Sequence, residues 1–271
     1  MKDNFILQNI EGIWLGTVPK LEEKGIKHAF TTKLHGKSIV RPDTLNMSLN
    51  VNDDVDFIIQ NRKAVCHALN LSFDRLTTPQ QVHSAESLYV DASLSGRGRE
   101  VFADAITQTD ALFTDVKDIP LMLLFADCTP IIISDPVKKV VAAIHAGWRG
   151  TVQMIVQKTI EKMSEQLGVQ AKDCMAAVGP AMGPCCYKVG EEVYNSARQN
   201  LPDYEKLFSF QSEGQWFFDL WQANKNQLLT AGLPEENIAV SGICTQCNKE
   251  LFFSHRADNG KTGRFAAIIW I

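Results

Sequence analysis

Two apolar runs between residues 121 and 150 constrain the fold more than any other feature of the sequence. They read LMLLFADCTPIII and VVAAIHA, and a Ser-Asp-Pro turn at 134–136 lies between them. Each run is too short to cross a membrane and has the β-branched enrichment of a buried strand. We therefore predict a buried hairpin in which Cys128 interrupts the first run and His145 ends the second. Because both lie a similar number of residues from the turn, we expect them to be close across the sheet.

A thiol and an imidazole at the ends of buried strands indicate a reactive site. The alternative is that Cys128 is a small hydrophobic core residue and that His145 merely ends a strand. Each residue is followed by a break in the apolar pattern, and a Gly-Trp-Arg-Gly sequence at 147–150 follows the second run. Together these features favour a functional role.

The rest of the chain predicts a mixed α/β protein. Its 271 residues are 45% hydrophobic and 21% charged, which is ordinary for a globular protein with a large buried core. Apolar periodicity and capping residues predict helices at 54–69, 151–167, a start at 190–192, and 219–231, with Gly168 as a C-terminal cap. Strands are expected at 13–15, 27–32, 78–91 with a polar interruption, 174–178, 238–244 and 264–271, and a long loop at 33–52. With no internal repeat and no low-complexity linker, we expect a single domain over 1–271.

Charge and cysteine content exclude several classes of protein. The formal net charge is -4 with a pI near 5.9 and no basic block, so we expect no nucleic-acid partner. No window has the roughly 18 apolar residues of a membrane span, and the N-terminus lacks the apolar region of a signal peptide. Seven irregularly spaced cysteines argue against a secreted disulfide scaffold. We therefore expect a reduced, cytoplasmic location.

His83, Cys128 and His145 form a candidate metal set. His83 lies where the strand pattern of its segment breaks, and three protein ligands leave a fourth position open, as in catalytic zinc sites. The competing interpretation is a Cys128 nucleophile with His145 as its base and Asp127 or another group orienting the imidazole. The sequence pattern leaves both interpretations open.

Other polar motifs are weaker candidates. Arg149 and the backbone N–H groups ahead of a helix expected to open at Thr151 would suit a phosphate, or form only a surface turn. Arg256 and Arg264 flank a Gly-rich turn and would bind an anion or pair with surface carboxylates.

The remaining cysteine motifs are weak signals. Cys244 and Cys247 form a single C-x-x-C pair, which is weak support for a metal site, so we interpret Cys247 as incidental. The adjacent Cys185 and Cys186 are interpreted as packing residues.

Several longer motifs resemble the YfiH-type laccase-domain family. They are QQVHS at 80–84, ADCTPIIISD at 126–135, AAIHAGWRGT at 142–151, GPAMGPCCYKVGEEV at 179–193 and FFSHRADNGKTGRFA at 252–266. FTTKLHG, SLNVNDD and the Asn-Arg pair at 61–62 extend the resemblance into the first quarter, so it covers nearly the whole chain. Cys247 and His255, where the family more often has Tyr, are local departures.

The resemblance implies a fold and a metal. The fold is α/β of the α+β type, a four-layer α/β/β/α sandwich with mixed β-sheets, CNF1/YfiH-like. The metal is zinc held by His83, Cys128 and His145. Members of the family have been called copper-containing polyphenol oxidases, purine nucleoside enzymes and putative cysteine hydrolases.

Ligand counting helps to choose among these activities. A four-copper laccase needs about ten histidines, whereas this chain has six, three of them outside the expected site. A multicopper oxidase is therefore excluded, although a single copper at the Cys/His2 set is not. The H-x-E and P-C-x-x-C signature of zinc deaminases is also absent, so any deamination must use another arrangement.

Our hypothesis is a zinc-dependent purine nucleoside enzyme. It would phosphorolyse adenosine, inosine, guanosine or methylthioadenosine to the base and ribose 1-phosphate, and it would also deaminate adenosine. The metal would act as a Lewis acid that activates water for attack at adenine C6. The metal or Arg149 would orient phosphate, and Arg256 and Arg264 are further substrate contacts. Glu86, three residues from His83, is expected to face the other side of its strand.

Three alternatives stay open. They are a copper-binding, laccase-like polyphenol oxidase, a Cys128/His145 cysteine hydrolase, and a non-catalytic metal-binding protein. The expected partners are purine nucleosides and phosphate, and a homodimer is left open. Loss of folding on zinc removal without turnover would favour the non-catalytic alternative.

Overall fold

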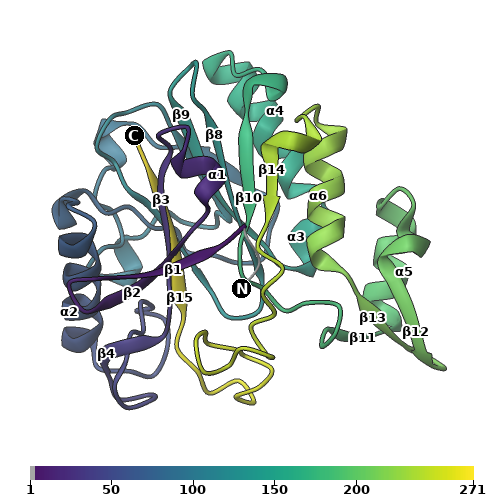
Figure 1. The fold of residues 1–271 in the computed structure, drawn as a ribbon, viewed down its shortest axis with the longest axis horizontal. Helices are drawn as coiled ribbons and strands as arrows, with labels where there is room; N and C mark the ends of the chain where they lie inside the picture. Colours follow the sequence, from purple (N-terminus) through teal and green to yellow (C-terminus); the bar gives the residue numbers. More distant parts are fainter. Residues whose placement is uncertain (1–3) are drawn as a thin grey trace.

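The computed structural model describes residues 4–271 as a mixed α/β fold built on two large sheets (Figure 1). The five-stranded sheet is antiparallel in the order β1-β2-β3-β15-β7. Its strands are β1 Ile6–Ile10, β2 Ile13–Thr17, β3 Lys27–Thr31, β15 Phe265–Trp270 and β7 Leu121–Phe125.

The six-stranded sheet is mixed, in the order β14-β10-β8-β9-β6-β5. Its strands are β14 Ile238–Val240, β10 Met175–Val178, β8 Thr129–Asp135, β9 Val140–Ala146, β6 Ala111–Thr114 and β5 Ser87–Tyr89. The outer pairs β10/β14 and β5/β6 are parallel, and the inner pairs are antiparallel. The predicted central hairpin is confirmed as β8 and β9, where Pro130 pairs with His145.

We predicted that the first apolar run forms one strand, and this prediction is wrong. The first half of the run is β7 in the five-stranded sheet, and its second half is β8 in the six-stranded sheet. The chain crosses between the sheets at 126–128, where Asp127 has a φ of 83° and breaks the extended backbone. Both halves are fully buried strands, so their apolar patterns look alike in the sequence.

The two sheets pack face to face and helices cover their outer faces. Ile132 of β8 packs with Phe125 in the core between the sheets, whereas Ile131 and Ile133 contact the helix side of the six-stranded sheet. On that side lie α4 Ile155–Leu167 and α6 Leu220–Thr230, and α2 Val55–Ala68 covers the five-stranded sheet (Figure 1). The layers therefore run helix, sheet, sheet, helix.

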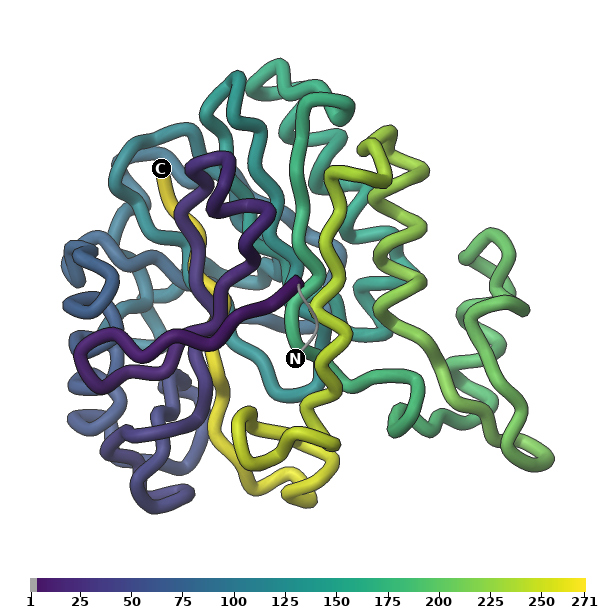
Figure 2. The backbone as a smooth tube through the Cα atoms, in the orientation of Figure 1, coloured from purple at the N-terminus to yellow at the C-terminus, as the bar shows by residue number. Residues whose placement is uncertain are grey.

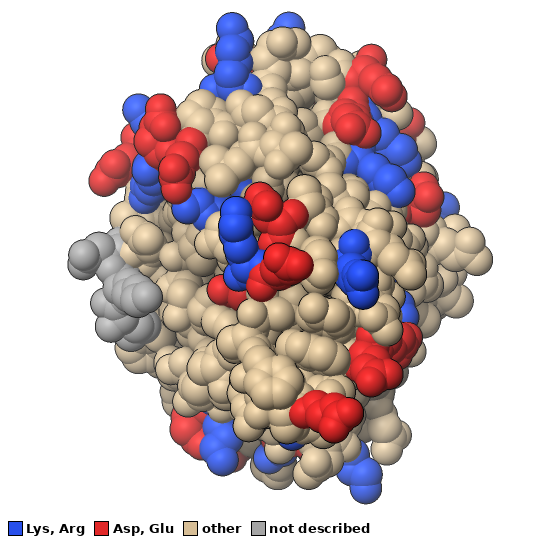
Figure 3. Space-filling model, turned by 90° about the vertical axis from the view of Figure 1, so that its right-hand side faces the viewer, with Lys and Arg blue, Asp and Glu red and all other residues tan. Residues whose placement is uncertain are grey.

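A third, three-stranded sheet stands to one side of the layers (Figure 2). It contains β11 Lys188–Gly190, β13 Gln215–Phe218 and β12 Phe208–Ser212, and it packs with α5 Glu191–Asn200. Its own apolar cluster includes Phe218, whose ring stacks on Phe208 with centroids 4.5 Å apart. On the side of the molecule that carries α5, acidic and basic side chains are interspersed (Figure 3).

The expected helices are largely confirmed, with one break. Asp54 caps α2 by accepting hydrogen bonds from the backbone N–H groups of Asp56 and Phe57. The helix predicted over 151–167 is two helices, α3 Trp148–Val152 and α4, because Met154 has a left-handed φ of 64°. Gly168, with a φ of 67°, ends α4 as predicted.

The remaining elements lie in the connections. The segment 33–52, predicted as a loop, contains the short strand β4 Leu34–Ser38, which bridges to Thr44. The segment 78–91 contains only β5, and the strand predicted over 238–244 ends at Val240. The short helices are α1 Pro19–Glu22, η1 Phe73–Arg75, η2 Ala92–Leu94, η3 Phe102–Asp104, η4 Ala171–Asp173, η5 Tyr204–Leu207 and η6 Glu235–Asn237. Across residues 4–271, no helix has the length and apolar character needed to cross a bilayer.

Candidate metal centre

The structure brings His83, Cys128 and His145 together at one edge of the six-stranded sheet. Their potential ligand atoms all lie within 4.8 Å of one another, and Cys128 Sγ is 3.8 Å from His83 Nε2. Cys128 immediately precedes β8 and His145 is the penultimate residue of β9, so the pairing of these strands brings the two residues close. His83 arrives from the loop before β5 with a φ of 62°.

A buried carboxylate, Asp110, holds two of these residues in place. His145 Nδ1 donates to Asp110 Oδ1 at 2.8 Å, which leaves Nε2 of the same ring to face Cys128. Asp110 also accepts hydrogen bonds from the backbone N–H groups of His83 at 3.0 Å and Ser84 at 2.7 Å. A histidine whose second nitrogen is bound by a carboxylate is the usual arrangement around a metal ligand.

Of the two possibilities that the sequence left open, Asp127 or another group, the structure shows another group, Asp110, beside the imidazole. Asp127 accepts from Thr245 Oγ1 and from the backbone N–H of Arg256, both at 2.7 Å. Asp127 therefore holds the loops around the site and does not orient the imidazole.

The site favours a thiolate beside an imidazolium when no metal is bound. Although burial raises the pKa of the Cys128 thiol, the neighbouring His145 and His83 lower it to about 6. Burial lowers the pKa of His145, but Cys128 and Asp110 raise it to about 9. Burial raises the pKa of Asp110, and its hydrogen bonds with His145 and Ser84 bring it below its ordinary value.

The donor set fits a zinc ion. Zinc prefers thiolate and imidazole ligands, and its catalytic sites have three of them with a fourth position open. Two imidazoles, those of His83 and His145, lie beside the sulfur. This favours a metal site over a Cys128 nucleophile, which would need only one base.

The three residues line a cavity of about 370 Å³, within the range typical of small-molecule sites. One part of its wall is apolar or aromatic and includes Phe102, Leu124, Trp148, Met182 and Tyr187. The polar part of the wall includes Gln81, Asn50, His255 and two arginines.

Two of the three candidate arginines line this cavity. Arg256 donates from Nη1 to the Lys188 carbonyl at 3.1 Å, and Arg264 donates from Nη1 to the carbonyls of Thr262 and Gly263. Within residues 4–271, neither guanidinium forms an ion pair or uses Nε or Nη2 in a hydrogen bond. Those N–H groups are left for an anion.

Arg149 and Glu86 lie elsewhere. Arg149 stacks over Trp148, 4.3 Å from the ring centroid, and reaches Glu192 at 3.4 Å, so it lies beside the cavity wall and does not line it. We predicted that Arg149 lies in a turn ahead of a long helix, but it lies within the five-residue helix α3. Glu86 forms an exposed pair with Lys162 at 3.4 Å, away from the metal set, as expected.

Two features of this region were not predicted. Asp110 had no assigned role, although an acidic residue directly before the buried strand β6 is a signal that could have found it. The four cysteines 185, 186, 244 and 247 lie together, so treating the two pairs separately was wrong.

Residues 27–271 match the sequence model of a family described as multi-copper polyphenol oxidoreductase laccase. The chain is 40% identical over 246 residues to purine nucleoside phosphorylase YlmD of Geobacillus stearothermophilus, covering 90% of each protein. It is 33% identical over 223 residues to adenosine deaminase RL5 of an unknown prokaryotic organism, covering 81% of this chain and 84% of that one. The crystal structure of YlmD from Geobacillus stearothermophilus superposes with a TM-score of 0.93 at 39% identity, covering 99% of this chain and 98% of that one.

Proposed function

The chain belongs to this laccase-like family, and we propose that it is a zinc-dependent purine nucleoside phosphorylase that also deaminates adenosine. Relatives named for each activity match most of its length. The observation that carries the proposal is that one cavity combines the His83, Cys128 and His145 set, two arginines with free N–H groups, and an aromatic wall.

The two reactions use the same substrate differently. In phosphorolysis the bond between ribose C1′ and the purine nitrogen breaks, a phosphate oxygen bonds to C1′, and the purine leaves with a proton. In deamination water replaces the amino group at purine C6, and ammonia leaves. We propose adenosine, inosine, guanosine and methylthioadenosine as substrates of the first reaction and adenosine as the substrate of the second.

The side chains of the cavity suit these substrates. Arg256 and Arg264 would bind phosphate through the N–H groups that the protein leaves free. Trp148, Tyr187 and Phe102 offer faces for a purine. Burial and the nearby Cys128 raise the pKa of the Tyr187 hydroxyl, so this group stays protonated and can donate a hydrogen bond.

Arg149 has a supporting role in this proposal. Stacked on Trp148 beside the cavity, it adds positive charge near the site where phosphate would enter. Bound zinc would supply Lewis acidity to the reaction. Asp110 would keep the His145 ring oriented for the metal.

The positions of the histidines argue against a multicopper oxidase. His28 is buried and bonded to the backbone of Val18 and Ile26, and His67 is a surface residue near Glu11. Neither can join a copper cluster with the cavity histidines. A trinuclear copper cluster and a blue-copper site need far more imidazoles than remain.

The test is a product analysis on metal-quantified protein prepared without added copper. Adenosine is incubated with and without phosphate, and adenine, inosine and hypoxanthine are separated by chromatography. We expect one zinc per chain at the His83, Cys128 and His145 set, phosphate-dependent release of adenine, and phosphate-independent formation of inosine. Cys128→Ala should lose this zinc and both products.

Cys174→Ala is the matched control, because Cys174 is a buried cysteine at the opposite end of β8 from the candidate metal set. It should keep both zinc and activity. If the zinc-loaded wild-type protein releases neither base nor inosine, the proposed function is wrong, and phenol oxidation after copper loading is the next reaction to assay.

A further inference from the structure

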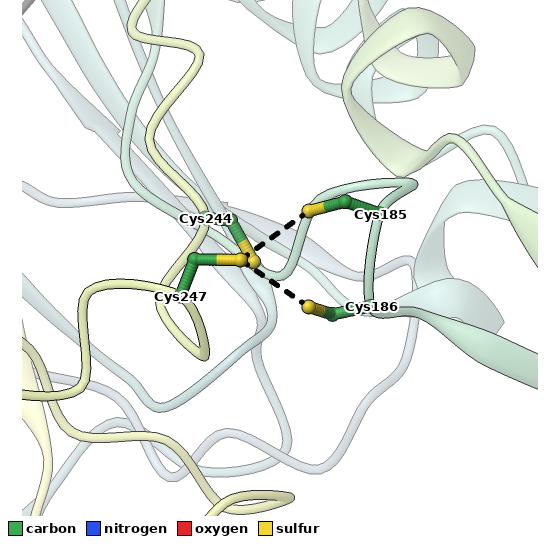
Figure 4. A group of neighbouring side chains, drawn as sticks. All are labelled: Cys185, Cys186, Cys244 and Cys247. Atoms are coloured by element: carbon green, nitrogen blue, oxygen red, sulfur yellow. Dashed lines mark hydrogen bonds between the residues drawn. The ribbon is translucent and has the colours of Figure 1, made fainter.

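Four cysteines outside the cavity converge on one point. Cys185 and Cys186 lie in the loop between β10 and β11, and Cys244 and Cys247 lie in the loop after β14. Their sulfur atoms are all within 4.8 Å of one another. Figure 4 shows the Cys247 sulfur next to that of Cys244 and facing both sulfurs of the other loop.

The distances match a tetrahedral metal site. Cys247 Sγ is 3.4 Å from Cys186 Sγ and 3.6 Å from Cys185 Sγ. A zinc–sulfur bond of about 2.3 Å places two thiolates of a tetrahedron ~3.8 Å apart. The sulfurs are too close together to surround a four-iron cluster, so they suit a single ion.

The C-x-x-C loop is held in shape by hydrogen bonds to one carbonyl. The backbone N–H and the side-chain amide of Asn248 both donate to the Cys244 carbonyl, at 3.0 Å and 2.8 Å. These bonds close the loop, and the Cys244 and Cys247 sulfurs lie within 4.8 Å of each other.

The opposite loop presents its two sulfurs by means of a tight turn. The backbone N–H groups of Cys186 and Tyr187 both donate to the Gly183 carbonyl at 2.9 Å. This turn directs two adjacent cysteines toward Cys247 (Figure 4). Adjacent cysteines on an extended strand would instead point to opposite faces.

Four neighbouring thiols need a cation to become thiolates together. Four thiolates within 4.8 Å of one another would repel each other strongly. A divalent cation replaces the thiol protons and removes the repulsion between the sulfurs. Two of the four residues are exposed, so an ion can reach them from solvent.

We propose that Cys185, Cys186, Cys244 and Cys247 bind a second zinc ion that joins the two loops. This site is structural, because four protein ligands leave no open position. It is separate from the His83, Cys128 and His145 set and does not depend on the proposed nucleoside chemistry.

The joined loops both reach the cavity. Tyr187, directly after Cys186, lines it, and Arg256 lies beyond Cys247 in the other connection and bonds the Lys188 carbonyl. Backbone bonds between the loops, such as the one from Thr245 N–H to the Ala181 carbonyl, hold the two segments in register. The second zinc would therefore rigidify two parts of the cavity wall without touching the substrate.

The test is a metal count on protein purified under reducing conditions without added metal. We expect about two zinc ions per chain in the wild type and about one in Cys247→Ser and in Cys128→Ala. The Cys128→Ala protein should keep the zinc that Cys247→Ser loses, and the double variant should hold none. Cys174→Ser, a matched control at a buried cysteine that bonds the Gln170 carbonyl, should keep both ions.

Cobalt substitution gives a readout that does not need a folded Cys247 variant. Cobalt bound to Cys128→Ala should show the intense sulfur-to-metal charge transfer of a four-thiolate tetrahedral site. Removal of the metal with a chelator should lower the melting temperature of the Cys128→Ala protein. If the wild type holds one zinc that Cys128→Ala loses, if the second site holds iron, or if the four cysteines are found as disulfides in freshly reduced and desalted protein, the proposal is wrong.

Discussion

Replacing Asp110 by Asn tests whether a buried carboxylate organises the metal set. In the wild type its two oxygens accept from His145 Nδ1, from the backbone N–H groups of Val82, His83 and Ser84, and from the Ser84 hydroxyl. All five partners are donors. An asparagine in this position must direct its own NH2 donor at some of them.

The least costly orientation keeps the amide oxygen on His145 and His83. The NH2 group then faces the backbone N–H groups of Val82 and Ser84, while the Ser84 hydroxyl can turn and accept. Two part-buried N–H groups that lose their acceptor cost at most about 1–3 kcal/mol each. The expected loss in the free energy of unfolding is therefore at most about 2–6 kcal/mol, against the roughly 5–15 kcal/mol of a typical protein.

The effect on metal binding comes in addition to this loss. With a neutral amide in place of the carboxylate, His145 loses the partner that increases its basicity. Loss of such a partner typically lowers metal affinity about 10–100-fold. Urea unfolding in the presence of chelator measures the stability change, and competition with a chromophoric chelator measures zinc affinity.

Asp91→Asn is the matched control. Asp91 is exposed and caps the short helix η2 by accepting from the N–H groups of Ser93 and Leu94, a role that Asn fills equally well. It should leave both measurements unchanged. Wild-type stability and wild-type zinc affinity in Asp110→Asn would refute the role that we assign to this carboxylate.

Two further predictions follow from the packing and the burial of single residues. Gly147→Ala should weaken zinc binding at the His83, Cys128 and His145 set, because the new Cβ would lie 3.0 Å from Cys128 Sγ and 3.1 Å from His83 Cδ2. Gly190→Ala, also at a helix N-cap, should leave zinc binding unchanged, because its Cβ would meet only the Gly214 carbonyl at 3.9 Å. Equal zinc affinities in the two variants would contradict this steric reasoning. Burial lowers the pKa of His28 below its ordinary 6.5 despite the Ile26 carbonyl and Glu22, so its contribution to stability is full above about pH 6.5 and is lost as the pH falls through the folded-state pKa. His28→Gln should lack this contribution to acid sensitivity. The urea unfolding midpoints of the wild type and the variant are measured at pH 7 and pH 5. If the difference between the two midpoints is the same at both pH values, the prediction is wrong.

The sequence predicted the central hairpin and the proximity of Cys128 and His145 because both depend on local patterns. Two buried strands and a short turn determine which residues face each other, and the strand ends then coincide. The helix capped at Asp54 was predictable for the same reason. His83 entered the candidate metal set because the strand pattern breaks there, and the motif resemblance agreed with this choice.

The division of the first apolar run could not be predicted from its pattern. A strand buried on both faces has no alternation, so residues 121–134 look continuous in the sequence. What divides them is the left-handed backbone of Asp127, whose side chain is held by Thr245 and Arg256 from distant parts of the chain. That turn depends on tertiary contacts.

The cysteine cluster was missed because each pair was judged by its local spacing. A single C-x-x-C and a vicinal pair are each weak signals. They meet only because β10 and β14 run parallel, so both strands leave the sheet at the same edge, and Ala181 then bridges to Cys244. No sequence window contains that information.

The same strand directions account for the whole site. β5, β6 and β8 begin at this edge, while β9, β10 and β14 end there. His83, Asp110 and Cys128 therefore come from the segments that enter strands, and His145 from the end of one. Across the core, β7 ends beside the start of β15, where Phe125 pairs with Phe265, and this brings Arg264 to the cavity. Because residues from both sheets meet at one edge, a change in how the sheets pack would move Arg264, which we propose binds phosphate, relative to the candidate metal set even with every candidate ligand intact.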